Sequence, residues 1–275
     1  WYLMTNAQPW DNLKFDLAGI EEVRRKFYGT LYNTYSFFSL YANIDGFLNK
    51  EETVPFEDRP VIDRWIISLA NTLIQEVDTD YANYEPTDAG RKIQAFVEDH
   101  LSNWYVRLCR RRFWKGEYSG DKISAYQTLY ECLITVAKLM APISPYFSEW
   151  LYKNLNDATR NEPAESVHLA LFPEVVHSHI DEKLEERMDY AQRISSLVLS
   201  LRKKEKIRVR QPLQKILIPV LNDSFIEQVN AVQDLIKAEV NVKEIEYITD
   251  ASGFIKKRIK PNYKTLGRRL GKDMK

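Results

Sequence analysis

The sequence predicts a mainly α-helical protein, in which a helix bundle is followed by a small α+β domain. Two observations lead to this prediction. In the first 160 residues, apolar side chains recur at spacings of three and four, which is typical of amphipathic helices. Further along, two short apolar runs at 215–220 and 242–248 flank a helical pattern at 224–239. This order is that of a β-α-β unit, whose two strands can pair in parallel.

Four apolar stripes make up the predicted bundle. Breakers separate them at 55–60, at Pro86 and at 116–120. Pro142 and Pro145 should bend the last of these helices or split it in two. Because the connections are short, the helices are expected to pack as a bundle. The stripes are Leu17, Ile20, Val23, Phe27, Leu31, Phe38 and Ala42; Ile62, Trp65, Ile66, Leu69, Leu73 and Val77; Ile93, Val97, Leu101, Trp104 and Leu108; and Ile123, Tyr126, Leu129, Leu133, Val136 and Met140.

We expect three regions along the chain: residues 1–16 as the end of a linker, 17–175 as the bundle, and 176–275 as the small domain. A short strand is predicted at 166–171. A long helix is predicted at 182–206, and its apolar side is Met188, Ile194, Leu197 and Leu201. The first residues resemble an element entered midway, so we expect the chain to be part of a longer protein.

Composition excludes several classes of function. The 275 residues carry a formal net charge of zero, and no apolar run approaches the ~18 to 20 residues of a membrane span. Cys109 and Cys132 both lie in helical patterns and are expected to be buried thiols. We find no nucleophile with a base, no metal-ligand set and no glycine-rich phosphate loop; His177 and His179 fall in a predicted linker. The chain is therefore expected to bind a partner without catalysing a reaction.

Basic residues gather in three runs, at 107–115, 202–215 and 256–275, while acidic residues gather elsewhere. Such a polarised distribution suits a protein with one side facing phosphates. The alternative for each run taken alone is a solvated helix face.

The segment 103–114 combines aromatic and basic side chains. Helical spacing places Asn103, Arg107, Arg110 and Trp114 on one exposed flank, and Trp104 on the core stripe. Aromatic rings can stack on unpaired bases, and guanidinium groups bind phosphates. This segment therefore indicates RNA binding.

Residues 103–105 (Asn-Trp-Tyr) resemble a motif in the anticodon-binding helix bundle of class I tRNA synthetases for isoleucine, valine and related amino acids. Further similar stretches follow in the family's order across the whole chain: 1–10 after the KMSKS loop, 31–38 as the first bundle helix and 141–149 as the kinked Ala-Pro helix. The stretches 208–213 (Arg-Val-Arg-Gln-Pro-Leu), 241–245 and 260–267 favour the C-terminal region of isoleucyl-tRNA synthetases within this group. The Arg-Arg-Arg-Phe-Trp form at 110–114 resembles eukaryote-like isoleucyl enzymes, which also occur in some bacteria.

The resemblance implies a non-catalytic, tRNA-binding part of a cytoplasmic ATP-dependent ligase. ATP and Mg would act in a catalytic domain, because neither the HIGH nor the KMSKS string occurs here. The implied partners are tRNA(Ile) and the catalytic and editing domains of the same polypeptide, with no membrane. Ser36 stands where many relatives have arginine, so a contact by that arginine would be absent or moved to Arg107 or Arg110.

The resemblance also implies site residues. The anticodon loop site would be lined by Asn33, Phe37, Trp104, Tyr105 and Arg107. Phosphates would be held by Arg110 and Arg111, and the runs 202–210 (with Arg208 and Arg210) and 256–269 would flank the anticodon arm or dock other domains. The alternatives are the same region of a valyl- or leucyl-tRNA synthetase, a helical protein-interaction scaffold, and a stand-alone hydrolase.

Overall fold

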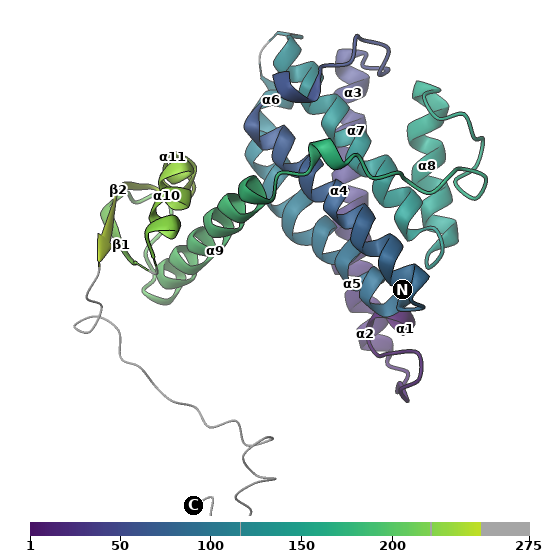
Figure 1. The fold of residues 1–275 in the computed structure, drawn as a ribbon, viewed down its shortest axis with the longest axis horizontal. Coiled ribbons are helices and arrows are strands. Elements are labelled where there is room, and N and C mark those ends of the chain that lie inside the picture. Colours follow the sequence, from purple (N-terminus) through teal and green to yellow (C-terminus); the bar gives the residue numbers. More distant parts are fainter. Residues whose placement is uncertain (116, 221, 249–275) are drawn as a thin grey trace, which may run out of the picture. The chain divides into compact units, whose positions relative to one another are not determined.

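The computed structural model describes residues 1–115, 117–220 and 222–248 (Figure 1). The chain divides into two compact units, Trp1–Met188 and Asp189–Lys275. The first unit is helical and the second carries one small parallel sheet, so the predicted fold class is confirmed. The units divide inside a helix, whereas the sequence predicts a domain boundary near residue 175. The basic run at 256–275 and the 260–267 motif lie outside the described residues.

Two long helical runs of the first unit each contain a stretch of π-helix. One run consists of α2 (Leu17–Val23), the π-helical η1 (Arg24–Tyr28) and α3 (Gly29–Asp45). The other consists of α5 (Pro86–Ala95), the π-helical η3 (Phe96–Val106) and α6 (Arg107–Trp114). A π-helix bonds to the fifth residue along instead of the fourth, so each stretch changes the phase of the helix that follows it.

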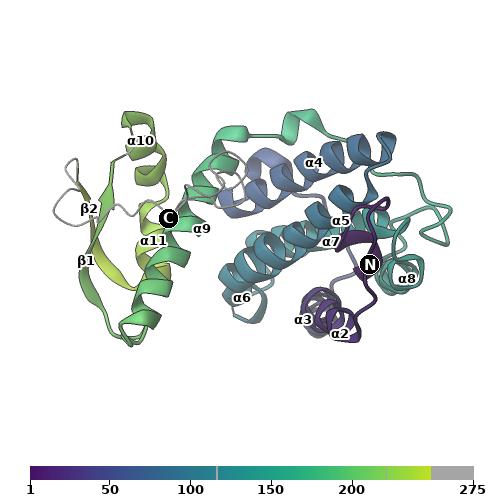
Figure 2. The same cartoon turned by 90° about the horizontal axis from the view of Figure 1, so that it is seen from below.

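Helix α7 (Gly120–Met140) is the centre of the first unit, and nearly all of its side chains are buried. It packs against α3, α5 and α6, against α4 (Val61–Ala82) and against α8 (Pro145–Thr159). Figure 2 shows α7 between α4 and α3. The predicted stripes supply most of this core, but Leu17 is exposed, the first stripe becomes fully buried only from Phe27 onward, and the other stripes include the half-buried Ile62, Leu69, Leu108 and Ile123. Phe27 stacks on Trp1, which precedes the short helix α1 (Tyr2–Thr5).

The connection after α8 crosses the bundle without forming a strand, so the strand predicted at 166–171 is wrong. Its backbone groups are satisfied by side chains of the helices instead. The N–H of Val176 donates to Asn71 Oδ1 (2.8 Å), and the N–H of Asp181 donates to Ser68 Oγ (2.8 Å). Short 3₁₀ turns, η2 (Phe56–Asp58) and η4 (His177–His179), lie in the connections. The split at the two prolines is confirmed, since α7 ends before Pro142 and α8 begins at Pro145.

The second unit contains the predicted β-α-β arrangement. Strands β1 (Leu213–Pro219) and β2 (Val242–Ile248) pair in parallel. The helical stretch between them is two helices, α10 (Asp223–Ala231) and α11 (Gln233–Val240). The long helix α9 (Glu182–Lys204) begins in the first unit and ends in the second. On α9 Met188 is buried as expected, but Leu197 and Leu201 are exposed.

Both cysteines are buried and free, as the sequence predicts. In the described part of the chain no helix combines the length and apolar character needed to cross a membrane.

A half-buried carboxylate at the start of α9 makes the stability of the first unit depend on pH. Glu185 accepts hydrogen bonds from Ser68 and from Thr72 (2.9 Å for Thr72). Burial raises the pKa of Glu185 above its ordinary value, although these hydrogen bonds oppose the shift. The folded chain therefore holds this proton more tightly than the unfolded chain does, and stability falls as pH rises from about 4.3 through the folded pKa.

We expect Glu185→Gln to remove this component of the pH dependence. The variant keeps an acceptor for both hydroxyls but carries no charge. Its free energy of unfolding should therefore increase relative to that of the wild type as pH rises. All six tryptophans lie in the first unit, so fluorescence during urea unfolding reports on that unit alone. Glu174→Gln, at an exposed position, controls for the loss of a carboxylate. Parallel pH curves for Glu185→Gln and the wild type would contradict the assignment.

Candidate nucleic-acid interface

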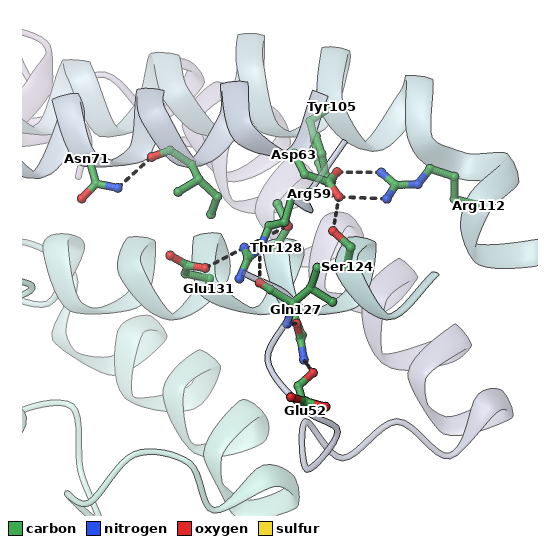
Figure 3. A network of polar contacts seen from close by, with 12 residues as sticks. Glu52, Arg59, Asp63, Asn71, Tyr105, Arg112, Ser124, Gln127, Thr128 and Glu131 are labelled. Carbon is green, nitrogen blue, oxygen red and sulfur yellow. Dashed lines mark hydrogen bonds and ion pairs between the residues drawn. The ribbon is translucent and has the colours of Figure 1, made fainter. Parts of the chain in front are cut away.

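The helix that carries the basic segment is anchored by a buried carboxylate. Asp63, on α4, is fully buried and accepts hydrogen bonds from three side chains (Figure 3). Arg112 donates to both oxygens (2.6 and 2.8 Å), the Tyr105 hydroxyl donates to Oδ1 (2.8 Å), and Ser124 Oγ donates to Oδ2 (2.6 Å). These donors come from α6, η3 and α7, so one carboxylate joins four helical segments.

The guanidinium of Arg112 is occupied by hydrogen bonds within this network, so it is not presented to a binding partner. Its Nε and Nη2 also donate to the side chain and the backbone carbonyl of Asp121 (3.0 and 2.8 Å). Burial disfavours the guanidinium charge, but the hydrogen bonds and charge of Asp63 outweigh it and raise the pKa of Arg112. Burial, together with the same carboxylate, raises the pKa of Tyr105. Both groups therefore stay protonated and keep donating to Asp63.

A second buried arginine fixes the loop between α3 and α4. Arg59 donates to the carbonyl of Val54 (3.1 Å), to Thr128 Oγ1 (3.2 Å) and to Glu131 (3.1 Å). Gln127 accepts from the N–H of Val54 (2.9 Å) and donates to the carbonyl of Glu52 (3.1 Å), and Figure 3 shows the contact with Glu52. The loop that follows α3 is thereby held against α7, which limits the freedom of the C-terminal end of α3.

The outer flank of α6 presents the remaining arginines to solvent. Arg107, Arg110 and Arg111 are all exposed. Arg107 Nε donates to the carbonyl of Asn103 (2.7 Å), and its guanidinium lies 5.4 Å from the centre of the Trp104 ring. Across the part of the chain that the structure describes, the side chains of Arg110 and Arg111 make no hydrogen bond or ion pair. These two cations are therefore available to an anionic partner.

The outer flank of α3 meets α6 at one aromatic contact. Phe37 is half-buried, and its ring lies 5.2 Å from that of Phe113 on α6, edge to face. Asn33 is exposed one turn earlier on α3. Asn33 and Phe37 thus lie one turn apart on α3, and Phe37 contacts the helix that carries the arginines.

Trp104 and Tyr105 lie in the core and not on this surface. Trp104 is 4% exposed and Tyr105 is fully buried. The indole N–H of Trp104 has no acceptor within the described residues. Neither ring presents a face to solvent, so neither can stack on a base while the bundle keeps this conformation. The π-helical geometry of η3 explains why both are buried, because successive side chains are closer in angle than in an α-helix.

In the second unit, a buried arginine organises the turn that carries Arg208 and Arg210. Arg202 is 3% exposed and donates to the backbone carbonyls of Arg208 (3.3 Å), Gln211 (3.0 Å) and Asn241 (2.9 Å). Arg208 and Arg210 themselves are exposed. The inward arginine therefore fixes the backbone from which the two outward arginines project.

The described residues contain no group of three or more histidine, cysteine, aspartate or glutamate side chains that could hold a metal ion. The surface on α3 and α6 instead combines unpartnered cations with aromatic and apolar side chains. Such a combination suits an anionic partner with planar groups, which is the chemistry of single-stranded nucleic acid.

Comparison with known proteins agrees with this geometry. Residues 63–217, more than half of the chain, match the family model described as the anticodon-binding domain of tRNA ligase. The chain belongs to this family. The match includes α4 from Asp63 onward, together with η3, α6 and α7, and therefore the whole Asp63 network.

Relatives along the full chain are isoleucine–tRNA ligases. That of Bacteroides thetaiotaomicron is 59% identical over 275 residues, 100% of this chain and 24% of the relative. That of Porphyromonas gingivalis is 58% identical over the same length, and that of Clostridium novyi is 42% identical over 274 residues, 99% of this chain and 26% of the relative. The chain spans about a quarter of the length of the curated relatives it matches. These relatives are bacterial, which contradicts the eukaryote-like form suggested by residues 110–114.

The sequence carried a signal for the anchoring ion pair that the motif-based prediction did not use. Asp63 lies at helical spacing from Ile66, Ala70 and Leu73, so it falls on an apolar stripe. A carboxylate in such a place requires a buried cationic partner. The run 110–112 offers that partner, but spacing along the chain does not show which of its three arginines turns inward.

We expect Asp63→Asn to destabilise the first unit by about 3 kcal/mol, because it leaves the partly buried Arg112 charge without its counter-ion. Asp121→Asn is the matched control. Asp121 is exposed, and its backbone carbonyl would still accept from Arg112, so the loss should stay below about 1 kcal/mol. Tryptophan fluorescence during urea unfolding measures both. Equal losses for the two variants would show that the Asp63 network does not anchor α6.

Proposed function

We propose that this chain binds the anticodon stem-loop of tRNA(Ile) and, as part of a cytoplasmic isoleucine–tRNA ligase, positions that tRNA for ATP-dependent aminoacylation. The observation that carries this proposal is the pair of exposed arginines Arg110 and Arg111, which have no partner among the described residues and lie on a helix of the anticodon-binding family. The names of the relatives support the choice of isoleucine. The catalytic chemistry, with ATP and Mg, belongs to a domain outside this chain.

The chemistry of the surface fits a single-stranded loop. Bases in such a loop are unpaired and can be read by edge contacts and stacking, whereas an A-form stem offers mainly shape and phosphates. Arg110 and Arg111 would hold phosphates, and Asn33 and Arg107 would contact base edges or backbone beside Phe37. Trp104 and Tyr105 would support the site from beneath, because their rings lie in the core.

Arg208 and Arg210 form a second basic surface, on the second unit. Their turn is held by Arg202, so their positions are set before any partner binds. We assign them to phosphates of the anticodon arm or to docking of the catalytic and editing domains of the parent enzyme. Weaker tRNA binding by Arg208→Gln would indicate contact with the anticodon arm, and unchanged tRNA binding would indicate docking of the other domains.

We expect Arg110→Gln to weaken binding of tRNA(Ile) and to flatten the salt dependence of its affinity. Loss of one phosphate contact should change the slope of log K against log salt by about 0.7 to 0.9. Arg25→Gln is the matched control, since Arg25 is an exposed arginine of η1, which directly follows α2, and α2 lies at the end of the first unit away from α6 (Figure 1). Fluorescence anisotropy of labelled tRNA at several salt concentrations measures both quantities.

The same titration separates the remaining candidates. tRNA(Ile) should bind more tightly than tRNA(Val) or tRNA(Leu). An unchanged slope for Arg110→Gln would contradict the phosphate contact, and absence of tRNA binding by the wild-type chain would overturn the proposed function.

A further inference from the structure

Trp114 is the exposed aromatic residue of the segment 103–114. The other three rings of this segment, Trp104, Tyr105 and Phe113, are 4%, 0% and 0% exposed, whereas Trp114 is 59% exposed. Trp114 occupies the last position of α6. It therefore presents a large π-surface to solvent on the helix that carries the unpartnered arginines.

Cations surround this ring. Trp114 follows Arg110 by four residues and Arg111 by three, so all three side chains lie on neighbouring positions of one helical face. Lys115 is adjacent and exposed. No acidic residue occurs from 107 to 115; the nearest one along the chain is the exposed Glu117, which Arg110, Arg111 and Lys115 outnumber, while Asp63 and Asp121 are engaged by Arg112. The electrostatic surroundings of Trp114 are therefore positive.

An apolar stripe on α3 lies beside the same end of α6. Phe113, the neighbour of Trp114, contacts Phe37, and the helical positions after Phe37 on that flank are Leu40 and Ile44. Leu40 and Ile44 are 55% and 68% exposed. Exposed apolar residues gathered in this way commonly mark a binding surface.

The charge decides which partner fits. A protein partner for an apolar stripe bordered by unpartnered arginines would have to supply carboxylates as well as apolar side chains. Each nucleotide of a single-stranded nucleic acid supplies both a negative charge, on its phosphate, and a planar apolar surface, on its base. Stacking of bases on aromatic side chains is also tolerant of sequence. We propose that Trp114 stacks on an unpaired nucleobase of the bound RNA, while Arg110 and Arg111 hold the adjacent phosphates.

This inference rests on the proposed function and adds the stacking residue to it. In this assignment Trp114, and not Trp104 or Tyr105, supplies the aromatic surface for a base. The apolar stripe of Leu40 and Ile44 borders the stacked base on the α3 side.

Replacement of Trp114 tests the proposal in the full chain with a labelled anticodon stem-loop of tRNA(Ile). We expect Trp114→Leu to weaken binding on the order of tenfold and Trp114→Phe to retain most of the affinity, because phenylalanine keeps a stacking ring. The salt slope should stay unchanged in both, since no phosphate contact is lost. Trp10→Leu is the matched control, because Trp10 is 67% exposed and lies outside the surface.

A set of stem-loops with one abasic site at each loop position identifies the stacked base. At one position the abasic change should weaken binding to the wild type but not to Trp114→Leu. Three results would overturn the stacking role. The first is that Trp114→Leu binds as tightly as the wild type, and the second is that Trp114→Phe binds as weakly as Trp114→Leu. The third is that the losses from Trp114→Leu and from the abasic change are additive at every loop position. Failure of the proposed function has a different signature, namely absence of binding by the wild-type chain.

Discussion

The contact on which the first unit depends is the ion pair between Asp63 and Arg112. A buried carboxylate is costly unless its lone pairs are filled, and Asp63 receives donors from α6, η3 and α7. Because three segments converge on one side chain, the rotation of α6 about its own axis is fixed. That rotation decides which arginines point outward, so the composition of the binding surface follows from a contact beneath it.

Both units use arginine in the same two ways. In the first unit Arg112 turns inward and leaves Arg110 and Arg111 outside; in the second, Arg202 turns inward and leaves Arg208 and Arg210 outside. The inward guanidinium has several donors in a planar fork, which lets it join several backbone or carboxylate oxygens at once. The net charge of zero conceals this arrangement, because the acidic residues are distributed elsewhere on the chain.

Much of the fold could be predicted from the sequence because it depends on periodicity. The stripes on α4 and α7 and the parallel pairing of β1 with β2 follow directly from apolar spacing. The 166–171 segment could not be predicted in this way, since its conformation depends on side chains such as Glu149, which bonds the N–H of Val167. The spacing predicts that Arg107 and Arg110 are exposed, as they are, but the burial of Tyr105 depends on the phase of a π-helix, which spacing rules for an α-helix do not contain.

The π-helical stretch η3 has a consequence for how this chain can vary in length. Deleting one residue from Phe96–Val106 while the stretch stays π-helical would shorten the run and turn everything after it, by less than the ~100° per residue of an α-helix. Arg112 would then leave Asp63, and one of its neighbours would enter the core. Substitutions along η3 change one side chain each, whereas an insertion or deletion there exchanges the inner and outer faces of α6. The number of residues between α5 and α6 is therefore under a stricter constraint than most of their identities.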